Sequence, residues 1–252
     1  MYNPLDLSGK LILVTGASSG IGRAISILLS RFGARLILAG RRAEALEDTL
    51  ALTENGTNHL TAVFDLTDLD NIPRWVEEIV QRTGTMLDGA VHCAGVSRHI
   101  PIRALSRTNI ESTMTANVHS ALMLLRGVTS KKVAQTAGMS IVLISSAAAL
   151  VASPGLTTYS ASKIGLSSIA RSAAKELAAK RIRVNCIAPA YVRTQMFDHA
   201  SNTIPDFQRI VAQQFLGLIE PEEVAVMAAY LLSDAARRVT GAQFVIDGGF
   251  TL

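Results

Sequence analysis

The stretch "KLILVTGASSGIGRA", residues 10–24, joins a short apolar run to a glycine-rich turn and to the start of a periodic segment. The run "KLILVT" (10–15) is apolar along its length, which is typical of a strand buried on both faces. Glycine permits the sharp turn that follows, and apolar residues then recur at helical spacing, at Ile21, Ile25 and Leu29. The stretch therefore predicts a strand, a tight turn and a helix in immediate succession.

Six more apolar runs of strand length follow along the chain, and segments with helical periodicity separate them. The runs are "RLILA" (35–39), "LTAVF" (60–64), "DGAVHC" (88–93), "MSIVLIS" (139–145), "RIRVNCIA" (181–188) and "QFVID" (243–247). Repeated strand–helix units predict an α/β fold with a parallel sheet and helices on both faces. No break in composition and no repeat divides the chain, so we expect a single domain over residues 1–252.

Composition and charge argue against several classes of protein. Lys and Arg number 24 and Asp and Glu number 20, and the basic residues are scattered, so we expect no nucleic-acid partner. No apolar stretch reaches the length of about 18 residues that a membrane span needs, so we expect no membrane partner. The five histidines show no HxxxH spacing and the cysteines no CxxC spacing, so we expect no metal site.

The N-terminus and the cysteines point to a cytoplasmic location. The sequence "MYNPLDLSGK" (1–10) contains no apolar run, so we expect no signal peptide. Cys93 and Cys186 both lie in strand-like apolar runs, which argues against a disulfide framework and for a reducing cytoplasm.

The turn after the first strand carries the glycine spacing GxxxGxG. Small residues let the backbone approach a pyrophosphate, and a helix N-terminus supplies free N–H groups and the positive end of a dipole. Such a turn also occurs without a ligand, but its place after the first strand of a strand–helix–strand run favours dinucleotide binding. The expected contacts are Gly16, Ser18, Ser19, Gly20, Ile21 and Gly22.

The residues after the second strand indicate which dinucleotide binds. A carboxylate about 20 residues past the glycines would hold the 2′-hydroxyl of NAD and repel a 2′-phosphate. This sequence has Gly40, Arg41 and Arg42 there, and arginine suits a phosphate. We therefore predict that NADP(H) is preferred over NAD(H). The alternative is that both arginines are simply polar residues at the start of a helix.

Asp65 follows the third strand-like run, in "FDLTD" (64–68). Its carboxylate could accept a hydrogen bond from the adenine amino group of a dinucleotide. It could equally cap the helix that begins near Leu69, a role for which Asp68 is better placed. The residues alone leave both roles open.

A serine, a tyrosine and a lysine form the candidate catalytic group. Tyr159 and Lys163 in "TTYSASK" (157–163) are four residues apart, so they share a face of a helix. Ser146 stands at the carboxyl end of a strand, where open α/β sheets bind ligands. In hydride transfer to a carbonyl, a phenol supplies the proton, a neighbouring ammonium favours the phenolate, and a serine hydrogen-bonds the carbonyl oxygen.

Each of these features also has a structural explanation. A Tyr–Lys pair four residues apart is often surface decoration, Ser145 and Ser146 could merely begin a turn, and Asn117 could lie on a solvated helix face. Their order along the chain favours chemistry. A glycine turn follows the first strand, serines follow a later strand, and YxxxK opens the next helix.

This combination of motifs resembles the short-chain dehydrogenase/reductase family, over residues 10–249. The matching motifs are "TGASSGIG" (15–22), "DL" (65–66), "AG" (94–95), Asn117, "SS" (145–146), "YSASK" (159–163), "RVNCIAPA" (183–190), Thr194 and "IDGG" (246–249). The resemblance implies a doubly wound (Rossmann-type) fold with a central parallel sheet of about seven strands. It implies that Tyr159 is the acid/base, that Lys163 tunes it and binds the nicotinamide ribose, and that Ser146 orients the carbonyl. Asn117 would hold a water that links Lys163 to solvent.

The resemblance also extends the set of expected cofactor contacts. Beyond the glycine turn, this set is Arg41, Arg42, Asp65, Leu66, Ala94, Gly95, Tyr159, Lys163, Pro189, Ala190, Val192 and Thr194. Two positions depart from the family pattern. The family's "NNAG" is "HCAG" (92–95) here, which puts strand packing in doubt more than chemistry, and its "PG" is "PA" (189–190). Cys93 in "HCAG" could act as a nucleophile, but a buried thiol in the core is the favoured interpretation.

The substrate lies beyond the motifs. We expect residues 191–219 to form a variable lid, with 96–102 and 147–156 as other walls of the pocket. The stretch "SSAAALVASPGLTTYSASK" (145–163) looks closest to the 3-oxoacyl-[acyl-carrier-protein] reductase-like branch of the family. The leading hypothesis is an NADPH-dependent reductase of a ketone or aldehyde carbonyl, with a 3-oxoacyl thioester modestly ahead of other small-molecule substrates.

Two other functions remain as alternatives. One is an alcohol, sugar or steroid dehydrogenase that works in the oxidative direction. The other is a non-catalytic cofactor-binding sensor, against which the complete catalytic tetrad argues. The resemblance also suggests a homotetramer, with the helix from Tyr159 and the terminal "QFVIDGGFTL" (243–252) at the interfaces.

Overall fold

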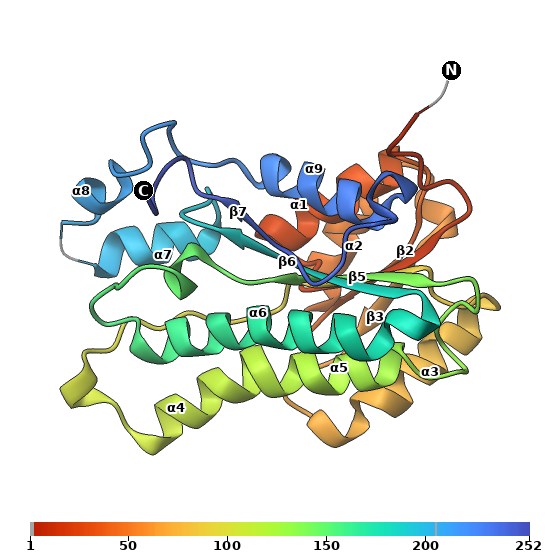
Figure 1. The fold of residues 1–252 in the computed structure, drawn as a ribbon, viewed down its shortest axis with the longest axis horizontal. Coiled ribbons are helices and arrows are strands. Elements are labelled where there is room, and N and C mark those ends of the chain that lie inside the picture. The colour runs from red at the N-terminus through yellow and green to blue at the C-terminus, as the bar shows by residue number, and fades with distance from the viewer. Residues whose placement is uncertain (1–2, 205) are drawn as a thin grey trace.

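The computed structural model describes residues 3–204 and 206–252, and their strands form one seven-stranded parallel sheet (Figure 1). The strands are β1 (Leu11–Thr15), β2 (Arg35–Gly40), β3 (Leu60–Val63), β4 (Gly89–His92), β5 (Met139–Ile144), β6 (Ile182–Pro189) and β7 (Gln243–Ile246). Their order in the sheet is β3-β2-β1-β4-β5-β6-β7, and all six pairs are parallel. The predicted doubly wound α/β fold is confirmed, and each strand begins and ends within one residue of its predicted run.

Helices cover both faces of the sheet. They are α1 (Gly20–Arg31), α2 (Ala43–Ala51), α3 (Ile72–Thr83), α4 (Arg107–Met114), α5 (Ser120–Val128), α6 (Thr157–Leu177), α7 (Gln195–Thr203), α8 (Phe207–Val211) and α9 (Pro221–Leu232). Figure 1 shows α1 and α9 on one side of the strands and α3, α5 and α6 on the other. Within the described part of the chain, no helix combines the length and the hydropathy that crossing a membrane requires.

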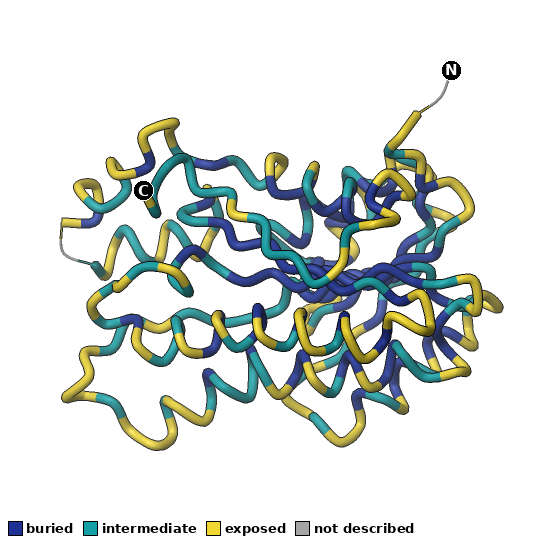
Figure 2. Tube along the Cα trace, in the orientation of Figure 1, coloured by how far each residue is buried: buried dark blue, intermediate teal, exposed yellow. Residues whose placement is uncertain are grey.

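The strands are buried on both faces because successive side chains point to opposite helix layers. In β1, Leu11 and Leu13 pack into the core on the side of α3, α5 and α6, while Ile12 and Val14 pack into the core under α1 and α9. Figure 2 shows the buried strands at the centre and the exposed turns of the helices outside them. This double burial explains why the strands are nearly continuous apolar runs in the sequence.

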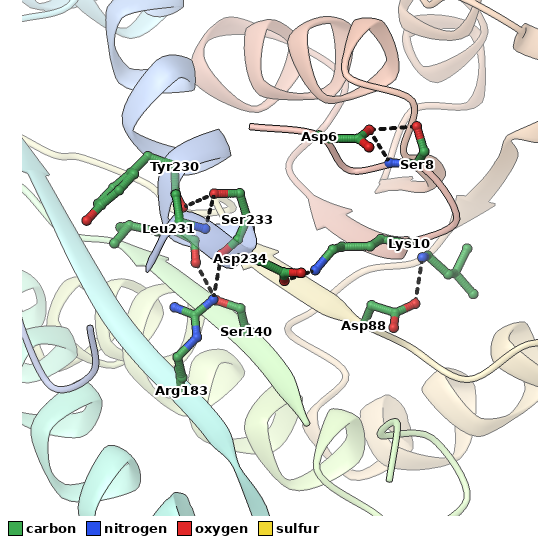
Figure 3. Close-up of polar contacts among 12 residues, drawn as sticks. Asp6, Ser8, Lys10, Asp88, Ser140, Arg183, Tyr230, Leu231, Ser233 and Asp234 are labelled. Carbon is green, nitrogen blue, oxygen red and sulfur yellow. Dashed lines mark hydrogen bonds and ion pairs between the residues drawn. The ribbon is translucent and has the colours of Figure 1, made fainter. Parts of the chain in front are cut away.

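Polar contacts close the edge of the sheet at which the strands begin (Figure 3). Lys10, just before β1, forms an ion pair with Asp234, which follows α9. The hydroxyl of Ser140 in β5 donates to the carbonyl of Leu231 at 2.7 Å. These contacts attach the end of α9 to the edge of the sheet at which the strands begin, and they stabilise the fold there. The loops at the opposite edge are available for a functional site.

The carboxyl ends of all seven strands meet at that other edge because the strands are parallel. The strand order reverses between β1 and β4, from which the chain proceeds outward in opposite directions. In open α/β sheets, ligands bind in the crevice at such a reversal point. The glycine turn follows β1, and Cys93 to Gly95 follow β4, so the topology brings these two motifs together.

His92 ends β4 and occupies the place of an asparagine in the family pattern. Its side chain is buried, Nδ1 lies 3.1 Å from the hydroxyl of Thr15, and Nε2 lies 3.5 Å from the hydroxyl of Ser120. It therefore braces β1 against α5, and the pairing of β4 with β1 is preserved with Thr15 opposite His92. Burial, reinforced by the charge of Lys163, lowers the pKa of His92 to about 3, so this imidazole is neutral in the folded protein.

We expect His92 to make the protein less stable in acid. An unfolded histidine has a pKa of about 6.5, so between pH 6.5 and 3 the unfolded state binds a proton that the folded state does not. The free energy of unfolding then falls with decreasing pH by up to about 1.4 kcal/mol per pH unit. His92→Asn keeps hydrogen-bonding groups but cannot titrate. Denaturant unfolding from pH 7 to pH 4 should therefore show a shallower loss of stability in this variant.

A suitable control is His119→Asn, because His119 is exposed. This variant should keep the pH dependence of the wild type. If the stability difference between wild type and His92→Asn is constant over this pH range, His92 is not held neutral by the fold.

Candidate active site

A cavity of about 490 Å³ opens at the carboxyl edge of the sheet. Every residue predicted to contact the cofactor or to act in catalysis lines it, apart from Asn117. These lining residues are Gly16, Ser18, Ser19, Gly20, Ile21, Gly22, Arg41, Arg42, Asp65, Leu66, Ala94, Gly95, Ser146, Tyr159, Lys163, Pro189, Ala190, Val192 and Thr194. Segments that lie up to 178 positions apart in the chain, from Gly16 to Thr194, therefore share one continuous wall.

The glycine turn is packed too tightly for side chains. A Cβ atom at Gly16, which has a φ of +69°, would lie 2.8 Å from the backbone nitrogen of Ala94. A Cβ atom at Gly22 would overlap the carbonyl oxygen of Gly16. The turn therefore requires glycine at both positions, and it lays the start of α1 directly on the end of β4.

The start of α1 is suited to a phosphate. Its N-cap residue, Ser19, has an extended backbone but makes no capping hydrogen bond through its side chain, and the first turn contains no acidic residue. The first N–H groups of a helix have no partner within the helix, and the helix dipole adds positive potential there. Because these groups border the cavity, the residues present fit the pyrophosphate of a dinucleotide.

The far end of the cavity carries two exposed arginines. Arg41 and Arg42 line it, and neither forms an ion pair with any residue in 3–204 or 206–252. Arg23 has a different role, because its guanidinium donates to the carbonyl of Ser18 at 2.8 Å and to the hydroxyl of Thr49 at 3.0 Å. Arg23 therefore braces the glycine turn, while Arg41 and Arg42 are available to a ligand.

Asp65 lies at the same end, and its carboxylate is already oriented. One carboxylate oxygen accepts hydrogen bonds from the backbone N–H and the hydroxyl of Thr67, both at 2.9 Å. The Thr67 N–H bond is the largest cause of the lowered pKa of Asp65, and the charge of Arg41 adds to it. Asp65 does not cap the turn at Leu69–Asn71, where Asp68 is the N-cap residue. Asp65 lines the cavity, and its second carboxylate oxygen makes no hydrogen bond within the described residues, so it can accept from a ligand.

The two serines after β5 have different environments. The hydroxyl of Ser145 is buried and donates to the carbonyl of Lys163 at 2.7 Å, which ties β5 to α6. The hydroxyl oxygen of Ser146 accepts from the backbone N–H of Ala148 at 3.2 Å and lies on the cavity wall. That bond holds the oxygen of Ser146 in place and leaves its proton for a ligand.

Tyr159 and Lys163 lie in the first two turns of α6 and share a face, as their spacing predicts. The ammonium nitrogen of Lys163 is 5.6 Å from the centre of the Tyr159 ring. Lys163 is 5% exposed, and its ammonium donates to the carbonyl of Ile144 at 2.9 Å. The end of β5 therefore holds a buried cation beside the tyrosine, so this pair is not surface decoration.

Asn117 lies behind the cavity wall rather than on it. It is fully buried in a π-helical turn, Thr115–His119, so a solvated helix face was the wrong alternative. Its amide oxygen accepts from the N–H of Val96 at 2.8 Å, and its amide nitrogen donates to the carbonyl of Val96 and the hydroxyl of Ser162, both at 2.9 Å. Asn117 therefore joins the segment after β4 to α6.

The two departures from the family pattern leave this geometry intact. Burial raises the pKa of Cys93 to about 12 despite the charge of Lys163, so Cys93 is a protonated thiol and a poor nucleophile. Asn55, Arg181 and Asp206 are the non-glycine residues with a positive φ in the described chain. Ala190 is not among them, so it has an ordinary negative φ. Its backbone N–H donates to the carbonyl of Ile246 at 3.0 Å.

The predicted lid contains two helices, α7 and α8; Pro205, between them, lies outside the described residues. Ten lid residues line the cavity: Tyr191, Val192, Thr194, Gln195, Met196, Phe197, His199, Ala200, Thr203 and Ile204. The other predicted walls contribute Val96, Ser97, His99, Ala147, Ala148, Ser153 and Leu156.

Phe250, near the C-terminus, also lines the cavity and was not among the expected pocket residues. The two glycines just before Phe250 are the sequence feature from which its position in the pocket could have been predicted. Gly248 and Gly249 both have positive φ, and the Asp247 carboxylate accepts from the N–H groups of Gly249 and Thr251. This turn folds the last residues back over the lid.

Comparisons with known proteins agree with this architecture. A family model described as enoyl-(acyl carrier protein) reductase matches residues 16–251. A 3-oxoacyl-[acyl-carrier-protein] reductase of Thermotoga maritima is 33% identical over 98% of this chain and 100% of its own length. An A-factor type γ-butyrolactone 1′-reductase of Streptomyces virginiae is 36% identical over 98% of this chain and 97% of its own.

A similar solved structure carries a nicotinamide cofactor. A structure described as an NAD(P)-dependent gluconate 5-dehydrogenase from Beutenbergia cavernae, with NADP bound at low occupancy, superimposes with a TM-score of 0.90 at 29% identity. The superposition covers 98% of this chain and 99% of that one. The motifs, the fold and the full-length similarity together show that the chain belongs to the short-chain dehydrogenase/reductase family of NAD(P)-dependent oxidoreductases.

Proposed function

We propose that the protein is an NADPH-dependent reductase of a ketone or aldehyde carbonyl. One observation supports the proposal. A single cavity is lined at one end by the start of α1, which has no side-chain cap, and by Arg41 and Arg42, and at the other end by Ser146, Tyr159 and Lys163. A dinucleotide bound at the start of α1 would extend along the cavity toward Ser146, Tyr159 and Lys163. A carbonyl oxygen near Ser146 and Tyr159 then lies where a proton donor and a hydrogen-bond donor converge.

The cofactor is held by backbone and side chains along the cavity. The N–H groups at the start of α1 would hold its pyrophosphate, and the second carboxylate oxygen of Asp65 would accept from its adenine amino group. Lys163 keeps two ammonium protons beyond the one donated to Ile144, and these bind ribose hydroxyls. When bound, the reduced nicotinamide supplies the hydride.

Ser146 and Tyr159 act on the substrate oxygen. Ser146 donates its free hydroxyl proton to that oxygen and stabilises the negative charge that develops on it. Tyr159 donates the proton that converts this oxygen into a hydroxyl. The Lys163 ammonium favours the negatively charged phenolate that remains, because it is a buried positive charge close to the ring.

Asn117 and Lys163 restore the proton. The side-chain amide of Asn117 already bonds Val96 and Ser162, and the water that would link Lys163 to solvent would be held at this turn of the chain. Interrupted helical hydrogen bonding at a π-helical turn suits such a role. Asn117 is thus a positioning residue whose side chain aligns the segment after β4.

Reduction of 3-oxoacyl thioesters stays the leading substrate hypothesis. The similarity to a 3-oxoacyl-[acyl-carrier-protein] reductase and to a γ-butyrolactone 1′-reductase supports a reductase that acts on a ketone. A screen of NADPH oxidation over acyl thioesters, keto sugars, steroids and diketones identifies the preferred carbonyl compound.

We expect Tyr159→Phe to abolish turnover while the cofactor still binds. General acid catalysis is worth about 10²- to 10⁴-fold, so kcat should fall at least about 100-fold with the best ketone of the screen. The dissociation constant for NADPH, measured by fluorescence titration, should stay within about 3-fold because the phenol is not needed for pyrophosphate binding. Unchanged turnover would exclude Tyr159 as the proton donor.

Tyr230→Phe provides the matched control. Tyr230 lies on α9, outside the residues that line the cavity, and loses the same hydroxyl. Its kcat and its NADPH affinity should equal those of the wild type.

The preference for NADPH rests on Arg41 and Arg42. No carboxylate stands at the end of β2, where Gly40 packs against Leu46 and Ser18, so nothing there repels a 2′-phosphate. Arg41 and Arg42 line that end of the cavity without an ion pair to any described residue, and charge-assisted bonds to phosphate are among the stronger polar contacts.

The double variant Arg41→Ala/Arg42→Ala should therefore lose affinity for one cofactor only. We expect the NADPH dissociation constant to rise at least about 10-fold, and that for NADH to change less than about 3-fold. Arg74→Ala, which removes an exposed arginine from α3, is the control and should change neither. An equal change for both nucleotides, or equal affinity for both in the wild type, would contradict the assignment.

A further inference from the structure

Tyr191 is a polar side chain at the substrate end of the cavity that the proposed proton transfer does not use. It lies two residues after the end of β6 and lines both the main cavity and a smaller hollow beside it, of about 170 Å³. Residues that line both spaces also include His99, Leu156, Ile204 and Phe250. Tyr191 therefore stands where the body of a substrate extends away from the reacting carbonyl.

The backbone of Tyr191 is fixed by a buried glutamine. Gln214 is 3% exposed, and its amide oxygen accepts from the N–H of Tyr191 at 2.6 Å. Its amide nitrogen donates to the carbonyls of Tyr191 and Gly217, at 3.2 and 3.1 Å. One side chain thus joins the start of the lid to its end, so the position of Tyr191 does not depend on the more exposed lid helices.

The ring of Tyr191 is fixed by other aromatic rings. It makes edge-to-face contacts with Phe207 of α8 and Phe250 of the C-terminal segment, with ring centres 5.1 and 5.5 Å apart. Phe197 of α7 contacts Phe207 in turn, at 5.1 Å. We call Tyr191, Phe197, Phe207 and Phe250 the aromatic wall. The wall restricts the Tyr191 ring to one orientation. Phe197 and Phe250 line the cavity and present apolar surface to a ligand, while the buried Phe207 supports them from behind.

The hydroxyl of Tyr191 has no partner within the described residues. The hydrogen bonds that Tyr191 makes there use its backbone N–H and carbonyl. Burial, and then the proximity of Tyr159, raise the pKa of Tyr191, so its hydroxyl is a protonated donor at neutral pH. A substrate that fills this end of the cavity removes the hydroxyl from water, and an unsatisfied donor costs free energy. A matching acceptor on the substrate removes this cost.

Permanent positive charge is absent from the substrate end, as far as the described lining residues go. The arginines of the cavity wall, Arg41 and Arg42, lie at the other end. Lys163 lies beside Tyr159 at the proposed reacting centre, where its ammonium also donates to the carbonyl of Ile144. His99 and His199 are the remaining basic side chains on the wall. A carboxylate or phosphate on the substrate would lose water without gaining a permanent cation, which disfavours it.

We propose that Tyr191 is a specificity-determining residue that donates a hydrogen bond to a second oxygen of an uncharged ketone substrate, while the aromatic wall packs against the apolar part. The thioester or ester carbonyl of a 3-oxoacyl compound is such an oxygen. The inference rests on the proposed carbonyl reduction and names the class of compound that the same site selects.

The test compares two ketones of equal chain length. Ethyl 3-oxobutanoate has a second carbonyl oxygen, and 2-heptanone does not. In the wild type we expect the higher kcat/KM for the keto ester. In Tyr191→Phe, the ratio of the two kcat/KM values should fall about 10-fold, which corresponds to one lost hydrogen bond. The ratio is the decisive quantity, because a general loss of folding or packing lowers both values together.

Tyr230→Phe is again the control and should keep the ratio of the wild type. A wild-type ratio that Tyr191→Phe leaves unchanged would overturn the inference while the proposed reduction stands. Absence of NADPH oxidation with every ketone in the wild type would overturn the proposed function, and the inference with it.

The charge requirement has its own measurement. The 3-oxobutanoate anion shares the reacting ketone with its ethyl ester but carries a carboxylate. We expect its kcat/KM in the wild type to be at least about 10-fold below that of the ester. A higher value for the anion than for the ester would overturn the claim that the cavity selects uncharged substrates.

Discussion

The close contact between the glycine turn and the end of β4 determines where the rest of the site lies. A side chain at Gly16 would press on the backbone of Ala94, and one at Gly22 would overlap the carbonyl of Gly16. Without these side chains, α1 starts directly on the carboxyl edge of the sheet. The helix terminus that is suited to an anion therefore faces the same cavity as Tyr159 and Lys163, and these residues meet there because every strand of the sheet is parallel.

Much of the fold and many site positions were predictable because they depend on local pattern. The strands are apolar runs of the right length, buried between two helix layers, and all seven were placed within one residue. Candidate site residues such as Arg41, Asp65 and Ser146 come within two residues of the end of a strand, and parallel strands end at one edge of the sheet. Placing residues at that edge needs only strand order and direction, without knowledge of side-chain contacts.

Other features depend on contacts between distant segments, which local pattern does not reveal. The π-helical turn that holds Asn117 leaves no simple periodic signal, and its amide bonds Val96 and Ser162, 21 and 45 positions away. Gln214 lies within the predicted lid, yet it is buried and its side chain holds Tyr191. Phe250 reaches the pocket only because the C-terminal turn folds back over the lid.

The central claim is that the cavity brings a reduced nicotinamide and a ketone together for direct hydride transfer beside Tyr159. The most direct measurement uses NADPH carrying deuterium at C4, prepared separately with the label on each face, and a ketone substrate. Mass spectrometry and NMR of the alcohol should show deuterium at the carbinol carbon from one of the two labelled forms. An alcohol with only solvent-derived hydrogen at that carbon from both forms, or no alcohol at all, would contradict the claim.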